Sequence, residues 1–309
     1  MLGNIQVKNN RHTLFRLFFA CAIAALCLSA CASAGGGSAP AATEPAAAAQ
    51  NASTGAASPT PTPDPNATPT PTPTPEYVDL SQYPEAPQPQ LDPTPDGDEI
   101  AVLHTDMGDI TLRFFPDYAP KAVQNFKTHA KSGYFNNNIF TRVVANQFVQ
   151  SGDPTGTGTG GQSIWGQPFQ GEPNLSLHNI YGAVSMIPDQ NGGQGSQFII
   201  VANKSLDSAV KTELESFKDK QNQVAGSTSD GTKIPFAQIY PLKIIDKYLQ
   251  GGGLPDLDRS ITVFAQVING FDALDKIAAV QTSSEAATKG KPLTDVKINS
   301  ITFEKYKAS

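Results

Sequence analysis

The stretch FTRVVANQFVQSGDPTGTGTGG, residues 140–161, holds two short runs in which apolar and polar residues alternate, followed by a glycine-rich segment. Alternation with a period of two is the pattern of a half-buried β-strand. Arg142 lies on the first run and Gln150 on the second. A further apolar run, GSQFII at 195–200, places Gln197 at the start of another strand. The sequence therefore predicts one arginine and two glutamines on the wall of a β structure.

Strands of the same kind are expected on both sides of these runs. Residues 100–114 predict a hairpin, because two alternating runs flank a Met-Gly-Asp turn. A helix is expected from Pro120 to Gly133, where apolar residues recur at helical spacing before a glycine. Further strands are expected at 139–144, 147–150, 183–187, 197–201, 261–267 and 296–303, with a second short helix at 271–279. Many short strands with two helices favour a closed antiparallel barrel, which leaves no exposed edge.

The two motifs, in this order of elements, resemble the cyclophilin family of peptidyl-prolyl isomerases over residues 100–203 and 254–303. The resemblance implies a mainly β fold over 98–309, namely a closed eight-stranded antiparallel barrel with two capping helices. It also implies peptidyl-prolyl cis-trans isomerase activity without a cofactor. Rotation of an X-Pro bond needs a dry pocket for the ring and a fixed donor for the twisted amide, but no nucleophile and no proton transfer.

The resemblance also implies roles for individual residues. Arg142 and Gln150 match catalytic positions, where the arginine fork can donate to the proline nitrogen and to the neighbouring carbonyl. The matches to substrate-binding positions are Phe148, Gln197, Leu257 and Phe140. Taken alone, an arginine or glutamine on a strand is usually a surface residue and Phe148 a core residue. Each of these assignments therefore depends on the motif that contains it.

Several positions depart from the family pattern in the wall of its proline pocket. Gln147, Ile199, Asp256 and Ile261 stand where the family has aromatic or histidine side chains, and Thr141 replaces a further histidine. The polar trio is retained, whereas much of the aromatic wall is not. Two hypotheses therefore remain: an isomerase, or a catalytically weak cyclophilin-fold module that binds proline-containing peptides or a protein partner.

Residues 204–253 form an insertion that the family pattern does not contain. Apolar residues at helical spacing within 210–217 and 242–249 predict two helices joined by a polar loop. The insertion also carries three large rings, Phe217, Phe236 and Tyr240. One hypothesis is that these rings fold over the rim of the proline pocket and replace the missing wall. The alternative is a self-contained helical outgrowth that faces solvent.

Residues 1–31 predict a signal peptide, because basic residues precede an apolar run shorter than the roughly 20 residues of a membrane span. Its last four residues, Leu-Ser-Ala-Cys, resemble a bacterial lipobox. That resemblance implies cleavage before Cys31 and lipidation of this residue, which would anchor the chain to the outer face of the cell membrane or in the envelope. The alternative is an ordinary secretory signal that is cut after a nearby small residue.

Residues 32–97 predict a disordered tether that is rich in Ala, Gly and Ser and then in a Thr-Pro repeat between Pro59 and Pro75. Alternating proline favours the polyproline II conformation. At about 3.1 Å per residue, the repeat would reach roughly 50 Å. A stiff spacer that lifts a domain off a membrane is favoured over a ligand for an SH3-like domain.

Charge and composition exclude several classes of function. Residues 1–31 hold three of the 22 basic residues and no acidic one, so the remainder carries 19 basic and 28 acidic residues, a net charge of −9. This balance argues against nucleic acid binding. The four histidines are scattered and all three cysteines precede residue 32, so no metal site and no disulfide framework are expected. We expect a monomer whose partners are proline-containing segments of exported proteins.

Overall fold

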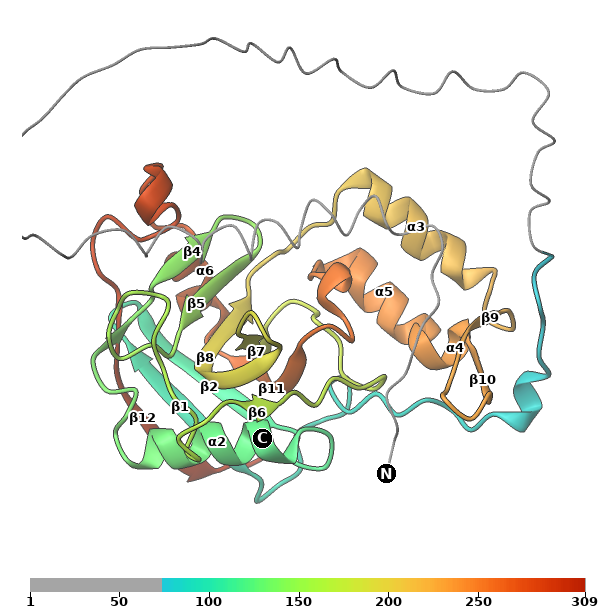
Figure 1. Ribbon diagram of the computed structural model, residues 1–309, viewed down its shortest axis with the longest axis horizontal. Helices are drawn as coiled ribbons and strands as arrows, with labels where there is room; N and C mark the ends of the chain where they lie inside the picture. The colour runs from blue at the N-terminus through green and yellow to red at the C-terminus, as the bar shows by residue number, and fades with distance from the viewer. Residues whose placement is uncertain (1–73, 309) are drawn as a thin grey trace, which may run out of the picture.

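The computed structural model describes residues 74–308 and shows a curled antiparallel sheet beside a helical lobe (Figure 1). The sheet has ten strands in the order β3-β12-β1-β2-β11-β7-β8-β5-β4, with β6 paired to β8. Its strands are β1 (Glu99–Thr105), β2 (Gly108–Phe114), β3 (Asn138–Ile139), β4 (Arg142–Val144), β5 (Phe148–Ser151), β6 (Phe169–Gln170), β7 (Ala183–Pro188), β8 (Gly193–Val201), β11 (Thr262–Asn269) and β12 (Lys297–Lys305). The mainly β prediction is confirmed.

Strands β3 and β4 stand at the two ends of the strand order, yet they are consecutive in the sequence and only two residues, Phe140 and Thr141, separate them. Between them, Phe140 N donates to Val296 O at 2.9 Å and Thr141 N donates to Gln150 O at 2.9 Å. No strand ladder joins β3 to β4 in the described part of the chain. The closed eight-stranded barrel is therefore not confirmed, because the chain crosses between the two edges instead of pairing along them.

Helices α2 (Pro120–Lys131) and α6 (Phe271–Ala278) lie at opposite ends of the sheet, as the two expected capping helices (Figure 1). Pro120 begins α2, where its fixed φ suits the first turn. The carboxylate of Glu172 accepts hydrogen bonds from the next two backbone N–H groups of α2, at 3.1 and 3.0 Å. This long-range cap holds the helix against the sheet and satisfies donors that would otherwise lack partners.

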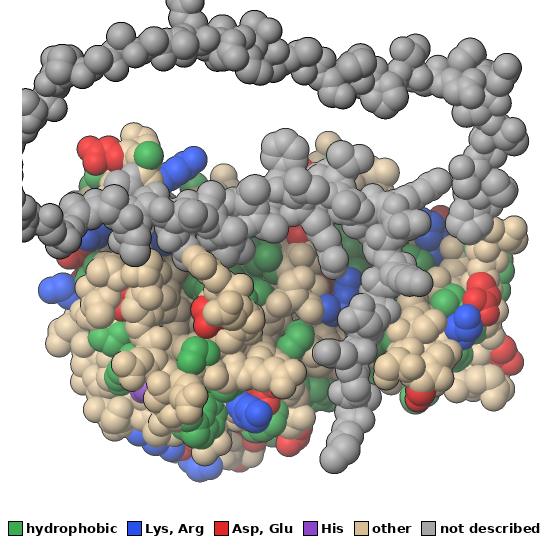
Figure 2. Space-filling view, in the orientation of Figure 1, with side chains coloured by type: hydrophobic (Ala, Val, Ile, Leu, Met, Phe, Trp, Pro, Cys, Tyr) green, Lys and Arg blue, Asp and Glu red, His purple; other side chains and the backbone are tan. Residues whose placement is uncertain are grey.

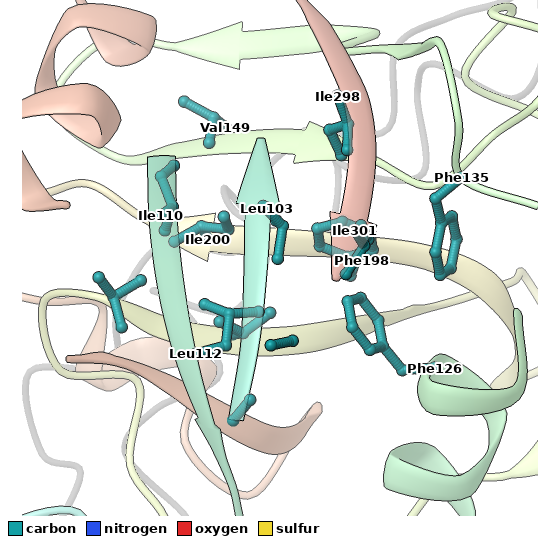
Figure 3. Packing of buried hydrophobic residues seen from close by; sticks show 14 of the residues in the cluster. Leu103, Ile110, Leu112, Phe126, Phe135, Val149, Phe198, Ile200, Ile298 and Ile301 are labelled. Carbon is teal, nitrogen blue, oxygen red and sulfur yellow. The ribbon is translucent and has the colours of Figure 1, made fainter. Parts of the chain in front are cut away.

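The concave side of the sheet encloses the main hydrophobic core (Figure 3). Leu103 and Leu112 from the first hairpin point toward Phe198 and Ile200 of β8, and Phe126 of α2 closes one end. The Phe126 ring lies 5.1–5.4 Å from three other buried rings. Burial of each such side chain stabilises the fold by about 1.5–3 kcal/mol. This core sets the curvature that brings β4, β5 and β8 together.

The insertion folds into a lobe with a core of its own. Its elements are α3 (Ser208–Lys218), β9 (Val224–Ser227), β10 (Lys233–Pro235), α4 (Phe236–Ile239) and α5 (Leu242–Gly251). The two predicted helices are thus confirmed, and the polar loop between them contains a hairpin that the sequence analysis did not predict. Ile180 of the barrel is 1% exposed and packs into the same core, which joins the lobe to the sheet.

The hypothesis of a replacement aromatic wall is wrong. The Phe217 ring stacks on Phe236 at 4.9 Å and on Tyr240 at 5.4 Å between ring centres, within the core of the lobe. These rings fill the space between α3, α4 and α5, because the lobe needs apolar residues for its own stability. They are therefore not available to cover a site on the barrel.

The chain packs against the domain well before the predicted boundary at residue 98. The backbone of Val78 donates to Asn222 O at 2.8 Å, and the side chain of Gln90 bonds both the N–H and the carbonyl of His178. The segment also includes a short 3-10 helix, η1 (Leu80–Gln82), and buries Ala86. Residues 74–97 thus form a strap across the lobe and the barrel, not the end of a free tether.

Acidic and basic side chains are interspersed on the face of the described chain that Figure 2 shows. Within residues 74–308, no helix is both long and apolar enough to cross a membrane. Cys31 and the predicted signal peptide lie outside the described residues, and so does the Thr-Pro repeat except for Thr74 and Pro75.

Candidate active site

Three neighbouring strands bring the predicted polar residues together. Arg142 of β4 stands directly opposite Gln150 of β5, and Gln150 stands opposite Ile199 of β8. Residues opposite each other in an antiparallel pair share a face of the sheet, and so do residues two apart on one strand. Gln197 therefore joins Arg142 and Gln150 on the outer face, although the three residues come from separate parts of the sequence.

The two glutamines form a hydrogen-bonded pair. Gln150 Nε2 donates to Gln197 Oε1 at 2.7 Å, and Gln197 Nε2 donates to Gly160 O at 2.7 Å. Gln150 is only 8% exposed, so this chain of amides is largely shielded from water. Within the described residues, no side-chain hydrogen bond joins Gln150 to Arg142. The hydrogen bond between the two glutamines thus fixes the orientation of their side chains, and other contacts hold Arg142 in place.

The glycine-rich loop after β5 is built around Asp153, which the sequence analysis did not single out. This fully buried carboxylate accepts hydrogen bonds from the backbone N–H groups of Thr155, Gly158 and Gly160, at 2.8, 2.7 and 3.0 Å. Burial alone would raise the pKa of Asp153, but these hydrogen bonds outweigh it and lower the pKa. The loop consequently presents the Gly160 carbonyl that orients Gln197.

The guanidinium group of Arg142 lies beside an aromatic ring, and part of this group has no hydrogen-bond partner among the described residues. Its guanidinium carbon is 5.5 Å from the centre of the Phe148 ring, and no atom of the described residues accepts a hydrogen bond from its buried Nε. Gly290 packs on the stem of Arg142, and Val143 N donates to Gly290 O at 2.7 Å. Burial lowers the pKa of Arg142, which still carries its charge at neutral pH. A buried N–H without a partner suits a donor that awaits a ligand.

An apolar cluster adjoins the arginine on the same face. Phe148, Ile199, Leu257 and Ile261 belong to it, with exposures of 3–9%. Leu257 comes from a 3-10 helix, η2 (Pro255–Leu257), at the end of the insertion. Phe148 and Leu257 are therefore brought together as predicted. At two of the departures from the family pattern, Ile199 and Ile261, aliphatic side chains keep the wall apolar.

Phe140 lies elsewhere, contrary to the substrate-binding role that the resemblance implies. Its side chain is fully buried in the main core on the concave side of the sheet. Phe140 lies in the link between β3 and β4, outside both strands, and points into the core although it is only two residues from Arg142. Phe140 is therefore a core residue, and its position in the motif reflects the packing of the barrel.

Comparison with known proteins identifies the fold and the family. A family model described as "Cyclophilin type peptidyl-prolyl cis-trans isomerase/CLD" matches residues 100–303. A protein of Staphylococcus saprophyticus, provisionally named a peptidyl-prolyl cis-trans isomerase, is 40% identical over 214 residues, which cover 69% of this chain and 96% of the relative. A protein of the same provisional name from Staphylococcus aureus strain COL is 40% identical over 217 residues, covering 70% and 98%.

Among solved structures, a cyclophilin-type peptidyl-prolyl cis-trans isomerase of Cryptosporidium parvum, crystallised in the presence of the dipeptide Ala-Pro, has 24% sequence identity and a TM-score of 0.48. That alignment covers 67% of this chain and 99% of the other. The family match spans most of the described residues and includes Arg142, Gln150, Gln197, Phe148 and Leu257 of the outer site. The chain therefore belongs to the cyclophilin-type peptidyl-prolyl cis-trans isomerases.

Proposed function

We propose that this isomerase acts on proline-containing segments of exported proteins at a membrane surface, where lipid on Cys31 anchors it. The observation that carries the catalytic part is the position of Arg142, a charged fork with an unpartnered buried Nε, beside the Phe148 and Leu257 cluster. An apolar surface next to a fixed donor is what the rotation of an X-Pro bond requires.

Each group of site residues has a separate role in the reaction. The proline ring packs on Phe148, Leu257 and the two isoleucines of the cluster, which removes water from the amide. Arg142 donates to the proline nitrogen as its lone pair localises in the twisted state. Gln150 and Gln197 hold the carbonyl of the preceding residue and fix one end of the rotating bond. A thousandfold acceleration needs only about 4 kcal/mol of preference for the twisted amide.

The alternative is a module of the same fold that binds proline-containing peptides and accelerates their isomerisation weakly. The specific observation in its favour is the aliphatic wall, since Ile199 and Ile261 stand where the family has rings. Aliphatic side chains bury a proline ring but lack the flat face on which it stacks. Measured turnover separates this alternative from the isomerase, because both bind the same peptides.

Substitution of Arg142 tests the catalytic role. We expect Arg142→Ala to lower kcat/KM for Xaa-Pro peptides about a hundredfold or more, as for loss of one transition-state donor. Arg142→Lys should recover little, since an ammonium lacks the fork. Unchanged thermal unfolding would show that the fold is intact. Equal activity of the wild type and Arg142→Ala would refute the assignment.

The proposed anchor depends on Cys31. Intact-mass analysis of the chain purified from membranes should show lipid on an N-terminal Cys31, with residues 1–30 removed. Cys31→Ser should abolish the lipid and release the protein from the membrane fraction, while isomerase activity per molecule stays the same. A mature N-terminus downstream of residue 31 in the wild type would contradict the anchor and leave the catalytic proposal intact.

A further inference from the structure

The carboxylate of Asp153 has no hydrogen-bonding capacity left for a substrate. Besides the three backbone N–H groups of the glycine-rich loop, it accepts the hydroxyl of Thr155 at Oδ1, at 2.7 Å, and that of Thr157 at Oδ2, at 3.1 Å. These donors fill the roughly four lone-pair sites of a carboxylate, and the residue is 0% exposed. Asp153 consequently acts on the protein around it and not on a bound peptide.

Gly160 lies directly against this carboxylate. Its N–H donates to Asp153 Oδ2 at 3.0 Å, and a Cβ at this position would lie 2.5 Å from Asp153 Oδ1 and 2.7 Å from Thr155 Oγ1. Only glycine therefore lets the backbone of the loop approach so closely. The carboxylate fixes the main chain at residue 160, and with it the direction of the Gly160 carbonyl that meets Gln197.

This carbonyl decides the orientation of two side-chain amides. The oxygen and nitrogen ends of a glutamine amide have nearly the same shape, so their hydrogen-bond partners select the orientation. A carbonyl only accepts, so the nitrogen of Gln197 faces Gly160 O and its oxygen faces Gln150. Gln150 must then turn its own nitrogen toward Gln197. Each amide nitrogen keeps a second hydrogen that a ligand can accept.

We infer that Asp153 is a positioning residue of the outer site, which acts through Gly160 to set the orientation of the Gln150 and Gln197 amides. A turned amide would present an oxygen where the substrate carbonyl needs a donor, and an unpaired polar group in a shielded site is costly. The inference deepens the proposed function and rests on it for the contact between these glutamines and the carbonyl that precedes proline.

A double-mutant cycle on the full chain tests this route. Asp153→Ala should lower kcat/KM for Xaa-Pro peptides about tenfold, because the amides lose their fixed orientation. In a Gln197→Ala background the connection is already broken, so the same substitution should lower kcat/KM less than about twofold. The fall in the unfolding temperature should be the same in both backgrounds, because it comes from the loop. A purely structural role would instead lower kcat/KM by the same factor with and without Gln197.

Gly160→Ala is a second variant that disturbs the same contact and leaves the carboxylate in place, so it replaces Asp153→Ala if that variant does not fold. We expect the same dependence on Gln197. Asp189→Ala is the matched control, since Asp189 Oδ1 accepts from two backbone N–H groups at 2.8 Å in the turn between β7 and β8. No hydrogen bond among the described residues joins Asp189 to Gln197. This control should keep kcat/KM within about twofold of the wild type.

The side-chain amide signals of Gln150 and Gln197 supply a readout that needs no activity. In nitrogen-15 NMR spectra of the protein without peptide, Asp153→Ala and Gly160→Ala should shift both pairs of signals, because each amide changes its hydrogen-bond partners. Asp189→Ala should leave these signals in place.

The outcomes separate this inference from the proposed function. Unshifted amide signals in the folded variants, or equal losses of kcat/KM in the two backgrounds, overturn the positioning role and leave the isomerase function intact. A wild-type chain without isomerase activity overturns that function, and shifted amide signals would then still support the orientation of the glutamines by Asp153.

Discussion

At the scale of single residues, the least expected contact is the one between Gly290 and Arg142. A Cβ at position 290 would lie 3.1 Å from Arg142 Cγ and 3.1 Å from Val143 O. Gly290 also has a φ of +86°, in the region that only glycine adopts readily. The glycine therefore lets a distant loop lie against the arginine stem and restricts where the guanidinium can point.

Gly290→Ala should consequently impair catalysis more than stability. We expect kcat/KM to fall about ten- to hundredfold, because a small displacement of a positioned group is costly. Gly231→Ala is the matched control, since its φ is +88° and nothing lies within 4 Å of its Cβ position. Both variants should lose about 1–2 kcal/mol of unfolding free energy. Similar activities for the two variants would show that Gly290 does not position Arg142.

At the scale of elements, a buried polar network fixes α5 of the insertion to the strand region of the site. Tyr248 of α5 donates to both carboxylate oxygens of Asp258, at 2.9 and 2.8 Å, and His178 Nδ1 lies 3.0 Å from Asp258 Oδ2. Burial alone would raise the pKa of Asp258, but His178 and the hydrogen bonds outweigh it and lower the pKa. Asp258 directly follows Leu257, so the network holds one wall of the site.

Tyr248→Phe measures what this connection contributes. Loss of a hydrogen bond to a buried carboxylate should lower the unfolding free energy by about 1.5–3 kcal/mol in chemical denaturation. Tyr181→Phe is the comparison, because Tyr181 donates to the partly exposed Asp275 at 2.7 Å. We expect a loss below about 1 kcal/mol there. Equal losses in the two variants would mean that the insertion is not coupled to the barrel through Asp258.

These elements also show what the sequence could predict. Arg142, Gln150 and Gln197 were predicted because each lies in a short motif whose strand pattern places it on a face. Most strands of the sheet and the two insertion helices followed from apolar periodicity, whereas β6 and the hairpin of β9 and β10 were not predicted. Gly290 was not predicted, because its contact with Arg142 joins segments far apart in the chain. Asp153 and Tyr248 were not predicted either, because hydrogen bonds to loop N–H groups or to Asp258 leave no periodic pattern in the sequence. Phe140 was misassigned because it lies in the link between β3 and β4, where the strand alternation does not hold, and it packs in the core.

At the scale of the whole molecule, the strap of residues 74–97 ties the lobe to the barrel. Glu76 forms an ion pair with Lys233 of the lobe, and Arg113 of β2 donates to the carbonyl groups of Pro89 and Asp92. Residues from Glu76 onward therefore pack with the domain, so its packed part starts before the predicted boundary at residue 98.

The pH dependence of the molecule should come from stability and not from chemistry. Arg142, Gln150 and Gln197 do not titrate near neutrality, so kcat/KM should be constant from about pH 6 to 9. Asp153 and Asp258 have lowered pKa values in the folded state. Their contribution to stability is present above the unfolded value of about 3.9 and is lost as the pH falls through the folded pKa values. Activity and circular dichroism should therefore decline together in acid, whereas a bell-shaped profile centred near neutrality would contradict this mechanism.

The central claim is that Arg142, beside its apolar cluster, accelerates rotation about an X-Pro bond. Exchange NMR on an Ala-Pro peptide tests it at equilibrium, with the full chain in catalytic amount. Without a catalyst, interconversion takes tens to hundreds of seconds and gives no cis–trans exchange peaks. We predict that the wild-type chain produces these peaks, at a rate at least about tenfold above the uncatalysed one, and that folded Arg142→Ala does not. An exchange rate with the folded wild-type chain equal to that of the peptide alone would contradict the claim.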